Sequence, residues 1–487
     1  MIDTAAIHST RLLPHWTPLG LSYIAATLER SGHKVSIIER DVIFRKNGLN
    51  LERVDNIMVE RLRMFRPDMV GISSPTELFP DVLRVARVVK NIFSDIPVVY
   101  GGHHATAVPI EVLEVCEYID IVVKGEGEET MQEMADGLDY KEVRGLLYRN
   151  GSSIIKNSPR NGTERLDDIP MPARHLLDMD FYTQQSHCLI RNLTLRATTM
   201  LTSRGCPFDC SFCVESLQFG KKPRYHSISR VLAELDDIIN RYQIEAIYFL
   251  DEGFLTSASR VAELCEALIK DSYNERIKWA AQARVDSLNR DLLDLMKAAG
   301  CIQLECGFET ASDRLLADVN KRTSHKKNLE IIDLIKSSGI RCLANIIMGL
   351  PGETEEEFYE TVRFIKNSGV DSVSFSKFSP HPGSSIYIDL IKKGTILEKF
   401  WENDVNCYEK FNFTSMPEER FRTLYKEIRN SLIQQINTKD RMMNTSILKR
   451  MLNISFQELR YRALHSPMMI LKFILNSITV RIFHKTR

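Results

Sequence analysis

Three cysteines stand close together near the middle of the chain, in the segment Thr202-Ser-Arg-Gly-Cys206-Pro-Phe-Asp-Cys210-Ser-Phe-Cys213. Intervals of four and three residues suit a compact loop around a metal centre, because soft thiolate ligands select iron–sulfur clusters or zinc. A structural zinc site needs four protein ligands, and no fourth Cys or His stands at a companion spacing nearby. The spacing therefore favours an iron–sulfur cluster with one open iron, and a structural zinc loop is the alternative.

The composition places this loop in an ordinary soluble protein. The chain has 487 residues, 44% of them hydrophobic and 26% charged, which suggests two to four domains. Its 64 basic and 64 acidic residues cancel, so charge gives no argument for a nucleic-acid partner. There is no secretory signal pattern and no apolar run of about 20 residues. Because the cysteines cluster instead of spreading as a disulfide framework, we expect a cytoplasmic, reducing environment.

The cysteine loop directly follows the first strand of a predicted α/β series in residues 197–417. Helices of ten to fifteen residues separate the strands. Six βα repeats in about 190 residues predict a partial or full (β/α) barrel, whose active site lies at the C-terminal ends of the strands. The predicted strands are Ala197–Thr202, Ala246–Leu250, Lys278–Ala283, Cys301–Gly307, Arg341–Met348 and Ser372–Ser376.

A second α/β unit precedes the barrel. Residues 1–140 alternate helix-like and strand-like segments, as a doubly wound parallel sheet requires, but no strand is recognised before the first helix, Leu19 to Gly32. Residues 141–196 are polar and contain prolines, and we interpret them as a linker. The sequence therefore predicts two α/β domains joined by a connector.

The C-terminal region, residues 418–487, is predicted to be helical and increasingly basic. Between residues 440 and 487, nine Lys or Arg stand against two Asp or Glu, a net charge of +7. One interpretation is a helical cap over the open end of the barrel. The other is an interfacial helix that makes peripheral contact with an anionic membrane, which would suit a lipid-like substrate. The cap is the favoured interpretation, because apolar helical stretches are usually buried.

The cysteine spacing, with the aromatic Phe212 before the last cysteine, resembles the signature loop of the radical S-adenosylmethionine (SAM) superfamily. The resemblance implies that Cys206, Cys210 and Cys213 ligate a 4Fe–4S cluster whose open iron chelates SAM. One electron then cleaves the sulfonium and gives a 5′-deoxyadenosyl radical. Later strand ends resemble the motifs of the same family that contact SAM. The residues implied in SAM binding are Phe212 of the cysteine loop and Asp251, Glu252, Arg284 and Glu309 of the later strand ends.

The N-terminal unit resembles the cobalamin-binding domain that precedes many such barrels. The matching segments are Pro18-Leu-Gly-Leu, Gly32-His-Lys-Val, Gly101-Gly-His-His-Ala-Thr106 and Lys124-Gly-Glu-Gly-Glu128. Glycine turns at strand ends let backbone approach a flat ligand. The resemblance implies that the corrin is held by Gly101, Gly102, His104, Gly125, Glu126 and Gly127. The DxHxxG motif, whose histidine binds cobalt from below, is absent. The sequence also predicts that this domain lacks the first strand that members of the family have.

Together these resemblances imply a cobalamin-dependent radical enzyme, a methyltransferase acting on an unactivated carbon. One SAM would methylate the cobalamin, and a second would generate the radical that activates the substrate. A cyclase of the tetrapyrrole type or an oxidative enzyme is the first alternative, and a non-catalytic corrinoid or iron–sulfur sensor is the second. We expect a small-molecule or lipid-like substrate, whose identity the sequence does not give, and an electron donor such as a flavodoxin or ferredoxin.

Overall fold

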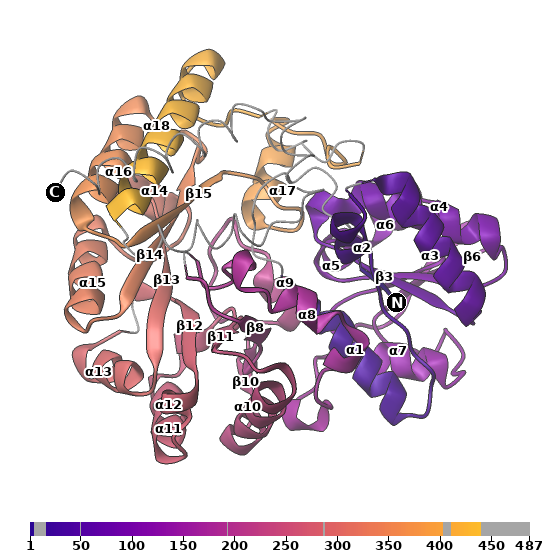
Figure 1. Cartoon of the computed structure of the whole chain (residues 1–487). Coiled ribbons are helices and arrows are strands. Elements are labelled where there is room, and N and C mark those ends of the chain that lie inside the picture. The colour runs from indigo at the N-terminus through magenta and orange to yellow at the C-terminus, as the bar shows by residue number, and fades with distance from the viewer. Residues whose placement is uncertain (4–15, 49, 192, 286–287, 403–410, 440–487) are drawn as a thin grey trace.

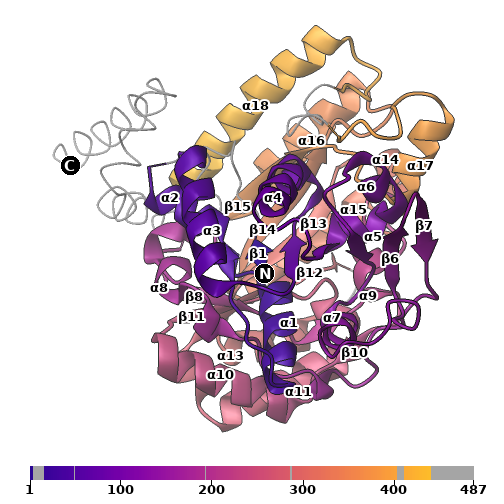
Figure 2. The same ribbon diagram turned by 90° about the vertical axis from the view of Figure 1, so that its right-hand side faces the viewer.

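The chain folds into two α/β units that lie side by side (Figure 1). Figure 2 views the molecule from the side of the N-terminal unit, with α3 (Leu51–Phe65) and α4 (Phe79–Ile92) in front of the barrel. The computed structural model describes residues 1–3, 16–48, 50–191, 193–285, 288–402 and 411–439.

The N-terminal sheet has seven strands, of which the first five are parallel. In spatial order they are β2 (Ile38–Glu39), β1 (Ile2–Asp3), β3 (Val70–Ser73), β4 (Val98–Gly101), β5 (Ile121–Val123), β6 (Leu146–Asn150) and β7 (Ser153–Lys156). The strand order changes direction between β1 and β3, because β2 lies on one side of β1 whereas β3, β4 and β5 follow on the other side. Doubly wound sheets bind their ligands outside the C-terminal ends of the strands at such a reversal. The loops after β3, β4 and β5 are therefore placed for ligand binding.

The structure corrects two expectations for this unit. A strand does precede the first helix: Ile2 is fully buried and pairs in parallel with Ile38 on one side and Ile72 on the other. The first strand of the sheet is therefore present. The segment 141–196 is also more than a linker, because β6 and β7 extend the sheet by antiparallel pairing. Their solvent-facing residues explain the polar composition that suggested a connector.

Helices cover both faces of this sheet, and strand residues alternate between them. Val98, Tyr100 and Val122 point to one face, while Val99 and Ile121 point to the other. On the first face α3 buries residues at helical spacing, and the helix is capped by a preceding asparagine. The remaining helices are α1 (Leu19–Arg30), α2 (Arg40–Lys46), α5 (His103–Ala107), α6 (Pro109–Val115) and α7 (Glu128–Ala135).

The second unit is a six-stranded, open parallel sheet with the strands in chain order, so the predicted barrel is confirmed as a partial one. The strands are β8 (Ala197–Met200), β11 (Ala246–Phe249), β12 (Lys278–Ala283), β13 (Cys301–Glu309), β14 (Arg341–Met348) and β15 (Ser372–Lys377). The helices are α10 (Ile228–Tyr242), α11 (Ala258–Lys270), α12 (Tyr273–Arg276), α13 (Arg290–Ala298), α14 (Asp313–Asp318), α15 (His325–Ser337), α16 (Glu355–Ser368) and α17 (Ser385–Lys392). In Figure 1, α13, α15 and α16 lie on the side away from the N-terminal unit, and α10 to α12 lie below the sheet.

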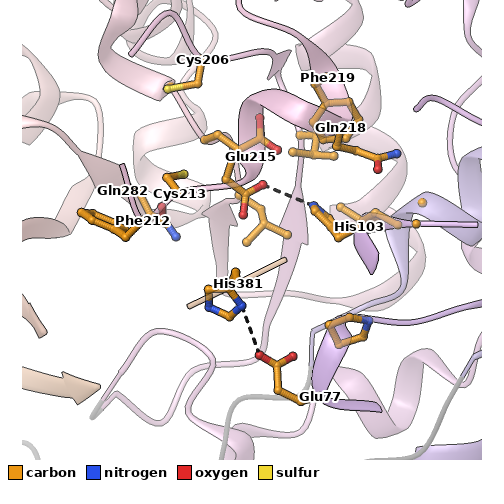
Figure 3. Close-up of a pocket in the computed structure, with 18 of the residues that line it drawn as sticks. Glu77, His103, Cys206, Phe212, Cys213, Glu215, Gln218, Phe219, Gln282 and His381 are labelled. Carbon is orange, nitrogen blue, oxygen red and sulfur yellow. Dashed lines mark hydrogen bonds and ion pairs between the residues drawn. The ribbon is translucent and has the colours of Figure 1, made fainter. Parts of the chain in front are cut away.

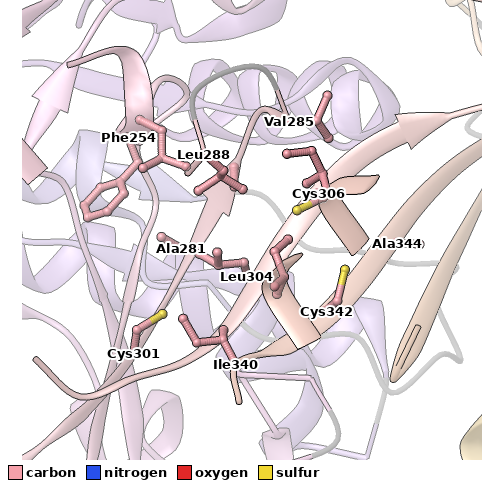
Figure 4. Close-up of a cluster of buried hydrophobic side chains, with 14 of the residues drawn as sticks. Phe254, Ala281, Val285, Leu288, Cys301, Leu304, Cys306, Ile340, Cys342 and Ala344 are labelled. Atoms are coloured by element: carbon pink, nitrogen blue, oxygen red, sulfur yellow. The ribbon is translucent and has the colours of Figure 1, made fainter. Parts of the chain in front are cut away.

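Several cysteines outside the signature loop belong to the barrel core. Cys301, Cys306 and Cys342 are fully buried among aliphatic side chains such as Leu304 and Ile340 (Figure 4). They pack as small apolar residues. The described cysteines that reach the central cavity are those of the signature loop.

The helix predicted to begin near Glu418 is α18 (Glu418–Lys439), which packs against β15 and α16. Phe421 and Leu424 are buried in the barrel core. The basic and apolar stretch of residues 440–487 lies outside the described residues, so the cap and membrane interpretations stay predictions. Within the described part of the chain, no helix combines the length and apolar character needed to cross a membrane.

Candidate active site

One cavity of about 1660 Å³ joins the C-terminal ends of the two sheets. The N-terminal unit contributes the loops after β3, β4 and β5, and the barrel contributes the cysteine loop and its strand ends (Figure 3). Pockets for one small molecule are usually roughly 300–1,000 Å³. This cavity therefore has room for more than one ligand, one on each sheet.

The cysteine loop is held at its base by a short antiparallel ribbon of β9 (Ser203–Arg204) and β10 (Arg224–Tyr225). Gly205 has a φ of +95°, and a Cβ there would lie 2.6 Å from the carbonyl oxygen of Lys222. Only glycine satisfies both conditions. The ribbon and this turn aim the cysteine loop into the cavity.

Asp251 anchors the start of this loop. Its Oδ1 accepts hydrogen bonds from the Thr202 amide at 2.9 Å, the Thr202 hydroxyl at 3.0 Å and the Ser203 hydroxyl at 2.5 Å. The carboxylate is fully buried and does not line the cavity. The predicted contact between Asp251 and SAM is therefore not supported, and its role is to position the chain before Cys206.

The middle of the loop is tied to two other barrel segments. The Ser211 amide donates to the Val319 carbonyl at 3.0 Å, and the Asn320 side-chain amide donates to the Asp209 carbonyl at 2.9 Å. The Ile386 amide in turn donates to the Ser211 carbonyl at 3.1 Å. These bonds fix the backbone that carries the three thiols.

Cys206, Cys210 and Cys213 all line the cavity as free thiols of intermediate exposure. Among the described residues, no three Cys, His, Asp or Glu side chains converge closely enough to hold a single metal ion. A structural zinc site takes four protein ligands, and the loop offers three thiols. In an iron–sulfur cluster the thiolates bind different irons, so this donor set fits a cluster. Burial raises the pKa of Cys213 to about 12, so metal binding must displace the proton.

Glu252 follows β11 and faces the cavity. Burial, reinforced by the neighbouring carboxylates of Glu215 and Asp251, raises its pKa well above the usual range. Its Oε2 atom is buried and finds no hydrogen-bond partner among the described residues. A buried acceptor of this kind is costly unless a cationic ligand meets it. The site fits the ammonium or sulfonium of SAM.

Arg284, at the end of β12, lies against the cysteine loop. Its Nη1 donates to the Cys210 sulfur at 3.3 Å, and its Nη2 donates to the Lys321 carbonyl at 2.8 Å. The guanidinium also lies 3.7 Å from the centre of the Phe208 ring. Arg284 lines the cavity as expected, and it links the cysteine loop to Lys321.

Glu309 ends β13 with a φ of +63° and forms a buried ion pair, 2.6 Å long, with Lys321. The Lys321 ammonium lies 5.9 Å from the centre of the Phe212 ring, and all three side chains line the cavity. A Cβ at Gly307 would come within 2.4 Å of the Glu309 carboxylate. The absence of a side chain at Gly307 is what allows the carboxylate into this position.

The predicted glycine loops line the opposite wall. Gly101, Gly102, Gly125, Glu126 and Gly127 all border the cavity. Gly102 has a φ of +98°, and a Cβ there would lie 2.8 Å from the Ser73 hydroxyl. Backbone therefore forms this part of the wall, as a flat ligand would require.

His104 is an exception among the predicted corrin contacts. It is fully buried between Phe79 and Trp401, with ring centroids 4.6 and 4.5 Å away, and its Nδ1 lies 3.1 Å from the Thr76 hydroxyl. Burial lowers its pKa to about 3, so the ring is neutral. His104 does not line the cavity, whereas its neighbour His103 does.

Comparisons with known proteins agree with this geometry. Residues 200–365 match the model of the Radical SAM superfamily, and residues 10–135 match that of the B12 binding domain. The chain is 34% identical over 388 residues to an uncharacterized methyltransferase of Pyrococcus horikoshii, covering 79% of this chain and 80% of that protein. The chain belongs to the radical SAM superfamily. It is a radical SAM enzyme whose cofactors are a 4Fe–4S cluster, SAM and cobalamin, as the motifs predicted.

This radical SAM enzyme is also similar to one further protein in sequence and to one solved structure in fold. It is 28% identical to the anaerobic magnesium-protoporphyrin IX monomethyl ester cyclase of Rubrivivax gelatinosus, over 82% of this chain and 69% of that protein. Its fold is similar to that of the radical SAM methyltransferase TsrM of Kitasatospora setae, solved with cobalamin and a [4Fe-4S] cluster bound. The TM-score is 0.65 at 18% identity, covering 80% of this chain and 74% of that chain.

Two histidine–carboxylate pairs that the sequence did not reveal cross the cavity of this radical SAM enzyme (Figure 3). His103 of the N-terminal unit lies 3.3 Å from Glu215 of the barrel, and His381 of the barrel lies 3.7 Å from Glu77 of the N-terminal unit. Burial acts to lower the pKa of His103, but the hydrogen bond to Glu215 raises it overall. Glu215 stands just after Cys213, which is the one local signal that marks it.

Proposed function

We propose that this enzyme is a cobalamin-dependent radical SAM methyltransferase that alkylates an unactivated carbon of a small-molecule or lipid-like substrate. The observation that carries the proposal is the single cavity of about 1660 Å³, which is shared by the cysteine loop and the glycine loops. A methyl carrier and a radical source must act on the same substrate atom, so both cofactors must reach one space.

When bound, the cluster supplies the electron that cleaves SAM, and cobalamin carries the methyl group to be transferred. Cys206, Cys210 and Cys213 would hold the cluster. Glu252 would face the positive charge of SAM, because its buried carboxyl oxygen has no other partner among the described residues. The backbone at Gly101–Gly102 and Gly125–Gly127 would support the corrin.

The remaining walls would protect the reaction from water. Aromatic and aliphatic side chains line the space between the polar groups, including Phe212, Leu250, Phe254, Ile347 and Phe378. Excluding water strengthens the electrostatic contacts of the strand-end groups and prevents side reactions of reactive species. The chain therefore contributes positioning and a dry cavity, and the cofactors contribute the bond chemistry.

A cyclase is the second candidate, and the similarity to the Rubrivivax gelatinosus enzyme favours it specifically. Both reactions would use the same cofactor walls, so the substrate decides between them. A non-catalytic sensor is less well supported, because a sensor needs neither the buried Glu252 carboxylate nor a cavity of this size.

We further propose that the protein works in the reducing cytoplasm, where thiols stay available for the cluster. A one-electron donor such as a flavodoxin or ferredoxin would supply the reducing equivalents. Peripheral membrane contact through the basic residues 440–487 stays a prediction, because that segment lies outside the described residues.

The test is an anaerobic assay of protein reconstituted with iron and sulfide. About four irons per chain should bind, and SAM with dithionite should yield 5′-deoxyadenosine. Cys210→Ala should lose both the iron and this product, whereas Cys265→Ala, which changes a buried core thiol of α11, should keep them. S-adenosylhomocysteine formed only when cobalamin is present would support methyl transfer. Full iron loading without either product would favour the sensor.

A further inference from the structure

The cysteine loop is fastened on both sides to the two glycine loops of the N-terminal unit. Three barrel side chains make these bonds, one before the cysteines and two after them. We call the set the clasp, and it consists of Arg204, Gln218 and Arg224 from the barrel with Thr106, Gly125, Glu126 and Glu128 from the N-terminal unit.

Four charged side chains form the core of the clasp. Arg204 donates to Glu126 and to Glu128, each at 2.6 Å, and Arg224 also pairs with Glu126. None of these four residues is more than 8% exposed. Buried ion pairs add little net stability, but removing one partner leaves an unpaired charge buried, which is costly. The clasp therefore holds one relative position of the two loops in preference to others.

Gln218 makes the uncharged part of the clasp. It belongs to α9 (Glu215–Phe219), the short helix that follows Cys213. Its Nε2 donates to the Gly125 carbonyl at 2.6 Å, and its Oε1 accepts from the Thr106 hydroxyl at 2.8 Å. The Thr106 hydroxyl accepts from the Gly125 amide at 3.0 Å, which closes the set. One amide thus touches both loops expected to hold the corrin.

The clasp has a consequence for cofactor binding, given the proposed function. Arg204 directly precedes Gly205 and Cys206, so the chain that carries the first thiol is fixed by Glu126 and Glu128. A cofactor that orders the loop on one side of the clasp reduces the entropy that the loop on the other side must lose. Such coupling is reciprocal by thermodynamic necessity.

We propose that the clasp couples the two cofactor sites, so that an assembled cluster tightens cobalamin binding and bound cobalamin changes the environment of the cluster. Coupling of the usual size would change the Kd by about five- to 150-fold. The inference goes beyond the proposed function, which requires both cofactors but no linkage between their sites.

The experiment measures the Kd of hydroxocobalamin for the full chain under anaerobic conditions, with and without the reconstituted cluster. Wild-type protein should bind more tightly with the cluster, by at least about fivefold. In Gln218→Met the ratio of the two Kd values should shrink towards one. Gln218 lines the cavity, so it could also contact the corrin directly. Loss of such a contact in Gln218→Met would raise both Kd values by the same factor and leave their ratio unchanged. Arg224→Gln serves as a second variant, and Arg224→Lys should recover part of the ratio.

Arg160→Gln is the matched control. It removes partly buried ion pairs to Glu129 and Glu133 in the same unit without touching the cysteine loop, so the ratio should stay at the wild-type value. The reverse readout is the electron paramagnetic resonance spectrum of the reduced cluster. Cobalamin should change that spectrum in the wild type and not in Gln218→Met.

Equal Kd values with and without the cluster in wild-type protein would overturn the inference. An unchanged ratio in both clasp variants would do the same. Failure of every form to bind cobalamin would remove the proposed function, and the coupling with it.

Discussion

Removing the positive charge of Arg284 should make the cluster harder to reduce. Its guanidinium donates to the Cys210 sulfur at 3.3 Å and is held there by the Lys321 carbonyl and the Phe208 ring. Reduction adds a negative charge to the centre that this sulfur would ligate, so the contact is stronger in the reduced state. Hydrogen bonds to the sulfurs are among the features that set such potentials.

The size of the effect follows from the strength of one charged hydrogen bond. Such bonds contribute about 1.5–3 kcal/mol. For a one-electron couple, about 1.4 kcal/mol corresponds to about 59 mV. If reduction gains most of this interaction, Arg284→Gln should lower the midpoint potential by about 60–130 mV. Arg284→Lys keeps the charge without the fork of donors, and we expect an intermediate value.

The assay is a redox titration of the reconstituted protein, followed by electron paramagnetic resonance. Arg322→Gln is the control, because its side chain is 62% exposed and lies 3.8 Å from Asp209 of the same loop. Solvent screens that charge, so its removal should leave the potential unchanged. A potential in Arg284→Gln equal to that of the wild type would refute the reasoning, and so would an equal shift in Arg322→Gln.

Three further changes test other parts of the structure. Gly205→Ala should fold but bind less than half of the wild-type iron in an iron assay, because the new Cβ would meet the Lys222 carbonyl at 2.6 Å; full loading would contradict this. Burial raises the pKa of Glu353 from 4.5 to about 8, so the folded state keeps a proton that the unfolded state releases, and stability falls as pH rises between these values. Glu353→Gln should abolish that fall in denaturant titrations and stabilise the protein by up to ~5 kcal/mol at pH 8, whereas an unchanged pH profile would show that the carboxyl is already ionised. Asp81→Asn should lower the free energy of unfolding by about 3–5 kcal/mol, because it removes a partner of the fully buried Arg40; a loss below about 1 kcal/mol would mean that other groups compensate the charge.

The sequence predicted both sheets but missed the first strand of one. The barrel strands were recognisable because each carries several apolar residues between helical segments. Strand β1 has only Ile2 and Asp3, too short for any periodicity to register. Its place in the sheet is set by pairing with Ile38 and Ile72, which are distant in sequence. The antiparallel edge strands β6 and β7 were missed for another reason, because one-sided burial makes their composition resemble a loop.

Within the site, local features were predictable and side-chain directions were not. The cysteine loop and the glycine turns depend on neighbouring residues, and both line the cavity as expected. Asp251 and Glu252 are adjacent at a strand end, yet only Glu252 faces the cavity. Likewise, His103 lines the cavity and its neighbour His104 does not. Adjacent residues point in different directions, and the register that decides between them is set by tertiary packing. Gln218 carried no local signal, because its partners come from another domain.

The chemistry of the domain boundary indicates what the interface between the two units is built for. An interface needed only for stability would be apolar, since replacing buried ion pairs with hydrophobic residues is often neutral or stabilising. Around the cysteine loop the boundary instead contains the four buried charges of the clasp and the Gln218 side-chain amide, which makes two hydrogen bonds. Directional bonds are satisfied in one arrangement of the two loops and broken by small displacements. The thiols and the glycine turns are thus held in a fixed relation, which is what a reaction between groups on two separate cofactors demands.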